Sequence, residues 1–493
     1  MTSLQSLQSF SARTGQPFGE PQAATSPEQL DAAVHAASLA FVSWSASTGA
    51  KRGTLLRGLA AALEADREAL VTLADEETAL GLPRLNGELD RTAFQLRRFA
   101  DIAERGVPFD VLNDPAVPGT PPAGHPAMLR QRVPLGPVAM FSASNFPFAF
   151  SVLGGDTASA LAAGCPVVVK AHTGHLLLSK HVAALADSVL QQQGLPAGLI
   201  SMVQGGGRDV GVRLLQHPAI AAGAFTGSTQ GGAALQAVAN ARPRPIPFYG
   251  ELGSINPVVA LPALLATKGA ELAATLAGSI SMGCGQFCTS PGVIVLINDA
   301  ASDAFVQQLT TALIAQNPHA MLTPGMRQAF DAGVAHLMGS GVKTLVHEAG
   351  TAAAPRPFLA QVDAAQFMAK AELREEVFGP ASLIVRAKSV AEAVDALHAV
   401  GGSLTVTLWG VDDDTLDNRA LVRAATAIAG RVLFAGVPTG VAVTAAQQHG
   451  GPWPSSTQPM TTSVGDAAME RFLRPVALQD APAWLLAREG RPC

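Results

Sequence analysis

Gly136-Pro137-Val138-Ala139-Met140-Phe141 and Cys165-Pro166-Val167-Val168-Val169-Lys170 are the two stretches that predict the fold. Each continues from a proline into a short apolar run, which is typical of a strand buried on both faces. Residues 158–163, between them, are expected to be helical, and further strands are expected at 200–203 and 223–227. Strands that alternate with helices predict a parallel sheet with crossover helices, so we expect an α/β protein.

The ends of these predicted strands carry polar residues. Asn145, Lys170 and Ser228 each stand at or just beyond a strand end, which is where parallel α/β sheets bind their ligands. Thr226-Gly227-Ser228-Thr229 could bind an anion through free N–H groups at a helix start, and it equally suits a simple helix N-cap. Gly205-Gly206-Gly207 could be a ligand-binding loop or a flexible turn. Neither this stretch nor the one around Gly227 fits the Gly-x-Gly-x-x-Gly fingerprint of dinucleotide-binding proteins.

The first hundred residues are expected to be helical. One helix begins at Pro27 with Ser26 as its N-cap. A second covers about 48–66 and a third about 90–105, because apolar residues recur there at helical spacing. Residues 107–126 are rich in proline and show little periodicity, so we expect an exposed connection.

Composition and charge limit the possible partners. The length of 493 residues predicts two or three domains. A net charge of −5 and a pI near 6.1 argue against a nucleic-acid or membrane-surface partner. Neither a signal-peptide pattern nor an apolar run long enough to cross a bilayer is present. Four cysteines make no disulfide framework, so a cytoplasmic protein is expected.

Residues 278–292 are rich in small side chains and centre on Cys288. Glycines there let the backbone approach a ligand closely and leave the sulfur accessible. The alternative is a buried structural thiol, which is what most free cysteines are. The spacing of Cys284 and Cys288 fits neither a zinc knuckle nor a redox pair, and no further ligands cluster beside them in the sequence. We therefore expect no metal site.

Six motifs occur in the order found in the aldehyde dehydrogenase superfamily, which the chain resembles from about residue 20 to residue 480. Any one motif is weak, but six in order are specific. Residues 285–291, 448–452 and 471–475 look most like the α-ketoglutaric semialdehyde dehydrogenase branch. The motifs are Asn145-Phe146-Pro147, Lys170 at a strand end, Phe225-Thr226-Gly227-Ser228, Glu251-Leu252-Gly253, Gly285-Gln286-Phe287-Cys288-Thr289 and Glu376-Val377-Phe378-Gly379-Pro380.

The resemblance implies that the chain oxidises an aldehyde to a carboxylic acid. Cys288 would attack the aldehyde carbon, giving a thiohemiacetal and then a thioester. The side-chain amide of Asn145 and the backbone N–H of Cys288 would hold the oxyanion. Glu251 would activate the water that hydrolyses the thioester, although it could also be an ordinary solvated glutamate. Cys284 is expected to be structural.

The same resemblance implies a nicotinamide cofactor. NAD-preferring relatives carry an acidic residue three positions after the lysine that matches Lys170, whereas here Thr173 follows His172. A carboxylate would repel a 2′-phosphate and these residues would not, which favours NADP, or use of both NADP and NAD. The other residues implied in cofactor binding are Gly207, Gly227, Ser228, Glu376 and Phe378, the last of which could equally be part of the core.

The branch resemblance implies 2,5-dioxopentanoate (α-ketoglutaric semialdehyde) as substrate and 2-oxoglutarate as product. The substrate carboxylate needs a cation, and Arg471 stands in the expected terminal region. The aromatic residues Phe146, Phe148, Phe287 and Trp453 would line the pocket, but they would also suit a long-chain or other aliphatic aldehyde. A CoA-acylating or a non-catalytic relative is a further alternative, disfavoured by the complete set of catalytic residues.

Three parts are expected along the chain. A Rossmann-like cofactor domain would cover 1–127 and 134–250, and an α/β catalytic domain would cover 251–440. Residues 128–133, which alternate like a strand, and 465–493 would form a small oligomerisation element. By the resemblance, these bridging segments would join subunits into a homodimer or a homotetramer.

Overall fold

The computed structural model describes residues 6–106, 109 and 111–486. Its first large sheet has five parallel strands in the order β7-β6-β5-β8-β9. Side chains alternate along the central strand, so Val138 and Met140 pack under one layer of helices while Ala139 and Phe141 pack under the other. The strands are β5 (Val138–Phe141), β6 (Val167–Lys170), β7 (Ile200–Val203), β8 (Ala222–Thr226) and β9 (Phe248–Glu251).

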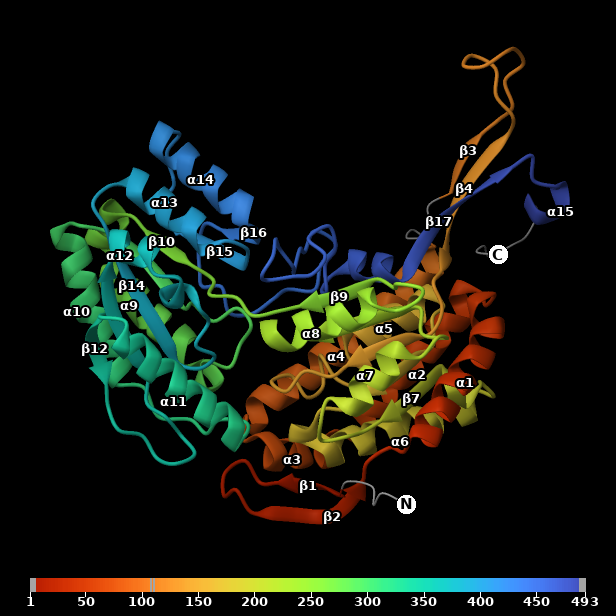
Figure 1. Ribbon diagram of the computed structural model, residues 1–493, viewed down its shortest axis with the longest axis horizontal. Helices are drawn as coiled ribbons and strands as arrows, with labels where there is room; N and C mark the ends of the chain where they lie inside the picture. Colours follow the sequence, from red (N-terminus) through yellow and green to blue (C-terminus); the bar gives the residue numbers. More distant parts are fainter. Residues whose placement is uncertain (1–5, 107–108, 110, 487–493) are drawn as a thin grey trace.

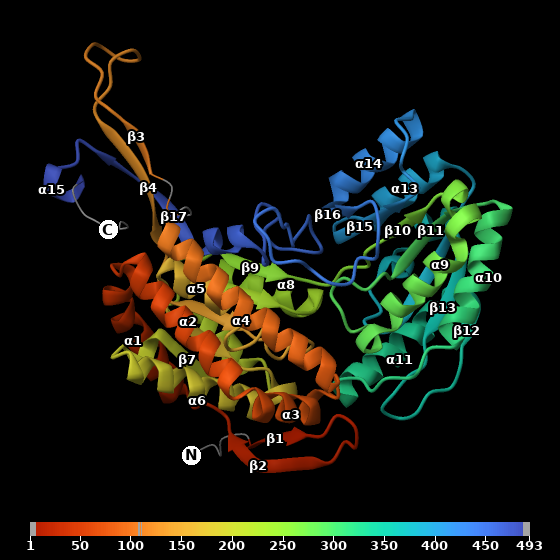
Figure 2. The same ribbon diagram turned by 180° about the vertical axis from the view of Figure 1, so that it is seen from behind.

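Helices cover both faces of this sheet (Figures 1 and 2). Their apolar sides and those of the strands form a continuous core, and removal of this surface from water is the main stabilising contribution. One layer consists of α2 (Gly49–Ala65), α4 (Leu82–Arg105), α5 (Gly155–Ala163) and α6 (Leu176–Gln192), and the other of α1 (Pro27–Ser45), α7 (Asp209–Gln216) and α8 (Thr229–Asn240).

The second large sheet has seven strands in the order β12-β13-β14-β11-β10-β15-β16, of which only the edge strand β12 runs antiparallel to its neighbour. Its strands are β10 (Val258–Ala260), β11 (Val293–Ile297), β12 (Lys343–His347), β13 (Phe358–Asp363), β14 (Ala381–Ala387), β15 (Ser403–Trp409) and β16 (Ala429–Leu433). Helices α9 (Pro262–Ser281) and α10 (Ala300–Ile314) pack on one face, and α11 (Pro324–Gly339), α12 (Ala364–Ala369), α13 (Val390–Val400) and α14 (Leu416–Ile428) pack on the other.

A third sheet extends away from the two large ones (Figure 1). It joins β3 (Leu112–Asp114), β4 (Met128–Pro134) and β17 (Leu473–Gln479) in antiparallel pairs. Just before β17, the 3₁₀ helix Asp466–Phe472 buries Met469 and Phe472 in the core of the first sheet. The end of the chain is therefore anchored on the first sheet before it enters the extended arm.

The N-terminal region differs from the predicted all-helical segment. Residues 6–23 form a hairpin of β1 (Ser6–Phe10) and β2 (Pro17–Ala23), because Gly15, with a φ of +69°, allows the turn. Helix α4 begins at Leu82, well before the predicted start, since Gly81 and Pro83 form its first turn. Helix α3 (Arg67–Thr78) was not predicted. Among the described residues, no helix is both long and apolar enough to cross a membrane.

Candidate active site

Cys288 lies in the loop that joins α9 to β11. The loop turns sharply at Gly283 and Cys284, both of which have positive φ. A Cβ added at Gly285 would lie 2.3 Å from the backbone of Gly379, so only glycine fits there. The side-chain amide of Asn256 donates a hydrogen bond of 2.8 Å to the carbonyl of Cys288. This hydrogen bond holds the backbone of Cys288, whose side chain is partly exposed. Cys284 is buried, as expected for a structural thiol.

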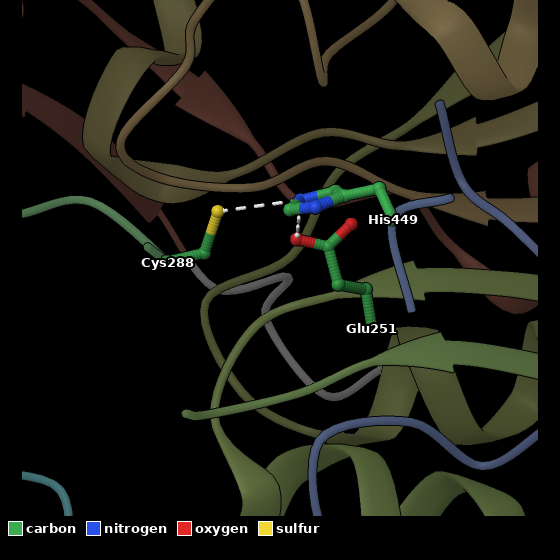
Figure 3. Close-up of side chains that lie close together, drawn as sticks. All are labelled: Glu251, Cys288 and His449. Carbon is green, nitrogen blue, oxygen red and sulfur yellow. Dashed lines mark hydrogen bonds and ion pairs between the residues drawn. The ribbon is translucent and has the colours of Figure 1, made fainter. Parts of the chain in front are cut away.

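Three side chains from distant parts of the chain meet at this cysteine (Figure 3). Glu251 ends strand β9, and His449 comes from the long segment after β16. The Nε2 atom of His449 lies 3.6 Å from Sγ of Cys288 and 2.9 Å from Oε1 of Glu251. The imidazole can therefore exchange a proton with either neighbour.

The charges of this cluster are set by burial and by these contacts. Burial and the negative charge of Glu251 raise the pKa of the Cys288 thiol well above its ordinary value. Burial would also raise the pKa of Glu251, but His449, Ser463 and Cys288 together bring it below the ordinary value. At neutral pH the glutamate is therefore ionised and the thiol protonated, so the cysteine needs a proton acceptor before it can act as a nucleophile.

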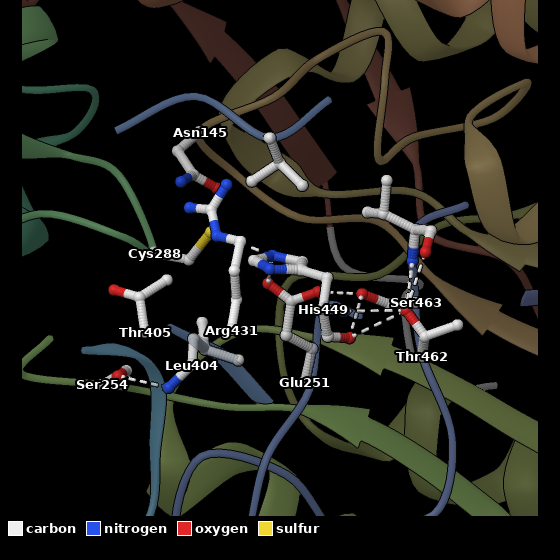
Figure 4. A network of polar contacts seen from close by, with 12 residues as sticks. Asn145, Glu251, Ser254, Cys288, Leu404, Thr405, Arg431, His449, Thr462 and Ser463 are labelled. Atoms are coloured by element: carbon white, nitrogen blue, oxygen red, sulfur yellow. Dashed lines mark hydrogen bonds and ion pairs between the residues drawn. The ribbon is translucent and has the colours of Figure 1, made fainter. Parts of the chain in front are cut away.

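A polar network surrounds the cluster (Figure 4). The hydroxyl of Ser463 donates to Oε2 of Glu251, and the backbone N–H of His449 donates to Thr462 at 2.8 Å. Near Cys288, Nδ2 of Asn145 donates to the carbonyl of Gln286 at 3.0 Å. A side-chain amide nitrogen carries two hydrogens, so Asn145 keeps one for a ligand.

A cavity of about 310 Å³ borders Cys288 and is also lined by Asn145 and Glu251. Glycine at position 253 keeps it open, since an added Cβ there would lie 2.3 Å from the Glu376 carboxylate. Burial raises the pKa of Glu376 to about 7, and a carboxylate in such a place can accept hydrogen bonds from ribose hydroxyls. The predicted cofactor residues that line this cavity are Gly227, Ser228, Glu376 and Phe378.

The other predicted cofactor residues lie beyond this cavity. Lys170 ends β6 and donates from Nζ to the carbonyl of Gly205 at 2.9 Å. Thr173 is exposed, whereas the ring of His172 accepts a hydrogen bond from the N–H of Gly174. Burial lowers the pKa of His172 to about 3, so this side chain is neutral and offers no positive charge to a phosphate. Gly207 is exposed just before α7.

A second cavity, of about 200 Å³, also borders Cys288 and is lined by Phe146 and Phe287, two of the predicted substrate residues. Their rings pack edge to face at 5.4 Å. Phe148 instead points into the core and is 2% exposed. Trp453 is 53% exposed and does not line this cavity. Phe148 and Trp453 therefore do not line the cavity beside Cys288, in contrast to the prediction.

Arg471 also differs from its predicted role as the cation for the substrate. Its guanidinium donates to Asp156 at 2.6 Å and to the carbonyl of Ala468 at 3.0 Å, and it stacks on Phe472. Its side chain is buried away from both cavities. The reason is Asp156, a buried acid 315 positions earlier that uses the positive charge within the fold.

The model of the aldehyde dehydrogenase family matches residues 1–475. The chain belongs to the aldehyde dehydrogenase family. This confirms the predicted α/β fold class and the predicted oxidation of an aldehyde to the acid, with NAD or NADP as cofactor.

Two relatives resemble this aldehyde dehydrogenase over nearly its whole length. Alpha-ketoglutaric semialdehyde dehydrogenase 2 of Azospirillum brasilense is 43% identical over 484 residues, covering 97% of this chain and 92% of that protein. Alpha-ketoglutaric semialdehyde dehydrogenase of Acinetobacter baylyi is 38% identical over 495 residues, covering 99% and 93%. The structure of glyceraldehyde-3-phosphate dehydrogenase GapN from Methanocaldococcus jannaschii, complexed with NADP, has the same fold, with a TM-score of 0.81, 18% identity and coverage of 97% and 99%.

His449 and Ser463 are the site residues that the sequence reasoning missed. Gln448-His449-Gly450-Gly451-Pro452 carried part of the branch resemblance, but no role was assigned to the histidine. A histidine between polar and glycine residues, without an apolar strand or helix pattern around it, was the available signal. Together with Cys288 and Glu251, His449 also offers donor atoms within 4.8 Å of one another. The sequence showed no further metal ligands near Cys288, but residues that are distant in the sequence bring such donor atoms beside it in the fold.

Proposed function

We propose that this aldehyde dehydrogenase oxidises 2,5-dioxopentanoate to 2-oxoglutarate with NADP. The observation that carries the catalytic part of the proposal is the contact of His449 with both Cys288 and Glu251 between two cavities. The substrate is supported by the names of the two relatives, which are 43% and 38% identical. The cavity lined by Phe146 and Phe287 would also admit a neutral aliphatic aldehyde, which is the second candidate substrate.

The first step uses the neutral thiol and its neighbour. His449 accepts the Sγ proton of Cys288, and the Glu251 carboxylate 2.9 Å away stabilises the imidazolium that forms. The Cys288 thiolate then bonds to the aldehyde carbon, and the carbonyl electron pair moves onto oxygen. The remaining Nδ2 hydrogen of Asn145 stabilises that oxyanion, which forms only along the reaction path.

The second half of the reaction releases the acid. A nicotinamide cofactor, when bound by Glu376 and the residues around Ser228, supplies the hydride acceptor that the thiohemiacetal needs to become a thioester. The ionised Glu251 then accepts a proton from water, whose oxygen attacks the thioester carbon. The carbon–sulfur bond breaks, and the thiolate of Cys288 is regenerated with release of the carboxylic acid.

The charges near the end of β6 favour NADP over NAD. Lys170 remains mainly protonated at neutral pH, since burial lowers its pKa only to about 8. Its strand pairs with β7, and the exposed Arg208 follows β7 by five residues. With Thr173 in place of an acid, this edge of the sheet presents positive charge and hydroxyl donors to a 2′-phosphate.

We also propose that the arm of β3, β4 and β17 joins subunits, as expected for 128–133 and 465–493. Leu112 in β3 is 55% exposed and Val117, between β3 and β4, is 44% exposed, and a subunit contact on the arm would cover both. The double variant Leu112→Asp and Val117→Asp is expected to shift the protein to a smaller assembly in light scattering. An unchanged mass would exclude the arm as the subunit contact.

The decisive test is initial rate with NADP and with NAD, against 2,5-dioxopentanoate and a long-chain aldehyde, for the wild type and Cys288→Ala. We expect preference for the dioxo acid and NADP, acid formation without CoA, and loss of activity in the variant. Preference for the long-chain aldehyde would overturn the substrate and keep the mechanism. Activity that survives in Cys288→Ala would overturn the mechanism.

A further inference from the structure

One face of helix α4 places three charged side chains at the substrate cavity. Arg84, Glu88 and Arg91 follow one another at spacings of four and three residues, so they lie on the same side of the helix. All three line the 200 Å³ cavity that also contains Cys288 and His449. Charged groups on the buried face of a helix are costly unless something pairs with them.

Arg84 is held rigidly but keeps a free donor. Its guanidinium lies 5.2 Å from the ring centre of Phe146 and 4.4 Å from that of Phe287. Nη2 donates to the carbonyl of Asn145 at 2.7 Å. Nη1 is buried and has no hydrogen-bond partner among the described residues. The Arg84 guanidinium is therefore held in place through Nη2, while Nη1 remains available to donate a hydrogen bond to a ligand.

Arg91 lies about two turns beyond Arg84 on the helix and is likewise only partly hydrogen-bonded. Nη1 donates to the carbonyl of Val441, while Nε is buried and has no partner within the described part of the chain. Burial lowers its pKa, and Glu88, Cys288 and Glu251 oppose that shift whenever they are ionised. The guanidinium is thus close enough to the catalytic groups to interact with them.

Glu88 does not neutralise the two guanidinium groups, because it accepts hydrogen bonds from the backbone instead. Its Oε1 accepts the backbone N–H groups of Phe148 at 2.8 Å and Ala149 at 3.0 Å, which fixes the loop that carries Asn145. Burial raises the pKa of Glu88, which favours its neutral form. The cavity therefore keeps an excess of positive charge at a site that a purely aliphatic substrate would leave unpaired.

We propose that Arg84 and Arg91 bind the carboxylate of the substrate and so select an aldehyde with a negatively charged far end. This rests on the proposed function and assigns the carboxylate partner that Arg471 does not provide. In an extended 2,5-dioxopentanoate the carboxylate carbon lies four C–C bonds, roughly 5 Å, from the aldehyde carbon. Both arginines and Cys288 line the same cavity, so a substrate held through its carboxylate has its aldehyde in the space that Cys288 borders.

The test compares two five-carbon aldehydes, 2,5-dioxopentanoate and pentanal, in Arg91→Gln, Arg91→Lys and Arg84→Gln. We expect the ratio of their kcat/KM values to fall on the order of 10- to 100-fold in each glutamine variant, because charge-assisted hydrogen bonds are lost for the dioxo acid alone. Arg91→Lys should recover part of the ratio. Arg105→Gln, on the exposed end of the same helix, is the matched control and should leave the ratio unchanged.

A second readout separates binding from folding. Glutarate, a five-carbon dicarboxylate with a second carboxylate in place of the aldehyde, should inhibit pentanal oxidation competitively in the wild type and at least about 10 times more weakly in Arg91→Gln. Equal losses for both aldehydes, or unchanged glutarate inhibition, would show that the arginines only brace the neighbouring loops. A wild type that oxidises pentanal but not the dioxo acid would instead overturn the proposed substrate, whatever the variants do.

Discussion

Replacement of His449 by glutamine tests the activation of Cys288 directly. Glutamine retains a polar side chain but cannot accept the thiol proton. Even an unperturbed cysteine with a pKa of about 8.5 is only ~3% thiolate at pH 7. Burial and Glu251 hold Cys288 below that fraction, and every further pKa unit costs a factor of about 10. Proton transfer by a positioned side chain is worth roughly 100- to 10,000-fold, so we expect kcat/KM to fall at least about 100-fold.

The reactivity of the thiol can be measured without the complete reaction. Alkylation by iodoacetamide, followed by mass spectrometry of the peptide that contains Cys288, reports the available thiolate. Burial raises the pKa of Cys165 to about 11 and that of Cys284 to about 12, so both react slowly. Cys493 lies outside the described residues, and a Cys493→Ser background removes it from the assay.

We expect alkylation of the His449→Gln protein at pH 7 to be at least about 10 times slower and to recover as the pH rises towards 9, because hydroxide replaces the missing base. His398→Gln, an exposed histidine on α13, is the control and should behave like the wild type. If His449→Gln retains both the rate and the pH dependence of the wild type, the imidazole is not the acceptor of the Cys288 proton.

Two further predictions concern the later step and the cofactor. Glu251→Gln should give a burst of about one NADPH per site followed by turnover roughly 100-fold slower, because the thioester forms and then waits for hydrolysis; equal loss of burst and turnover in a stopped-flow trace would contradict this role. Burial lowers the pKa of Lys170 to about 8, so its charge is present below that pH and lost above it. The kcat/KM ratio of NADP to NAD should therefore fall between pH 7 and 9 in the wild type and stay flat in Lys170→Gln; a flat wild-type profile would remove Lys170 from phosphate recognition.

The parts of the site that the sequence predicted are those fixed by local pattern. Asn145, Lys170 and Ser228 stand at or just beyond the carboxyl ends of short buried strands, and parallel pairing brings such ends to one edge of a sheet. Small residues around Cys288 likewise mark a backbone that must turn sharply and approach a ligand. Both signals depend on a few neighbouring residues and are therefore readable along the chain.

The parts that the sequence did not predict depend on contacts across long separations. His449 is 161 positions from Cys288, and the partner of Arg471 is 315 positions away. Whether an arginine meets a substrate or a buried aspartate is decided by which segments pack together, and residue type alone carries no such information. The hairpin of residues 6–23 was not predicted for a related reason. Its two short strands pair with each other, and Ser9 contacts Glu77, which is 68 positions away in the sequence.

The distribution of unsatisfied polar atoms gives one more argument for the location of the substrate. Arg84, Glu88, Arg91 and His449 each bury a nitrogen or oxygen that has no partner among the described residues, and all four line the same 200 Å³ cavity. Leaving such an atom unpaired costs about 1–3 kcal/mol, and more when the group is charged. Four such atoms around one space mark a place where a ligand with matching polar groups gains hydrogen bonds. A molecule with an anionic end and several oxygens meets that condition, and a saturated fatty aldehyde does not.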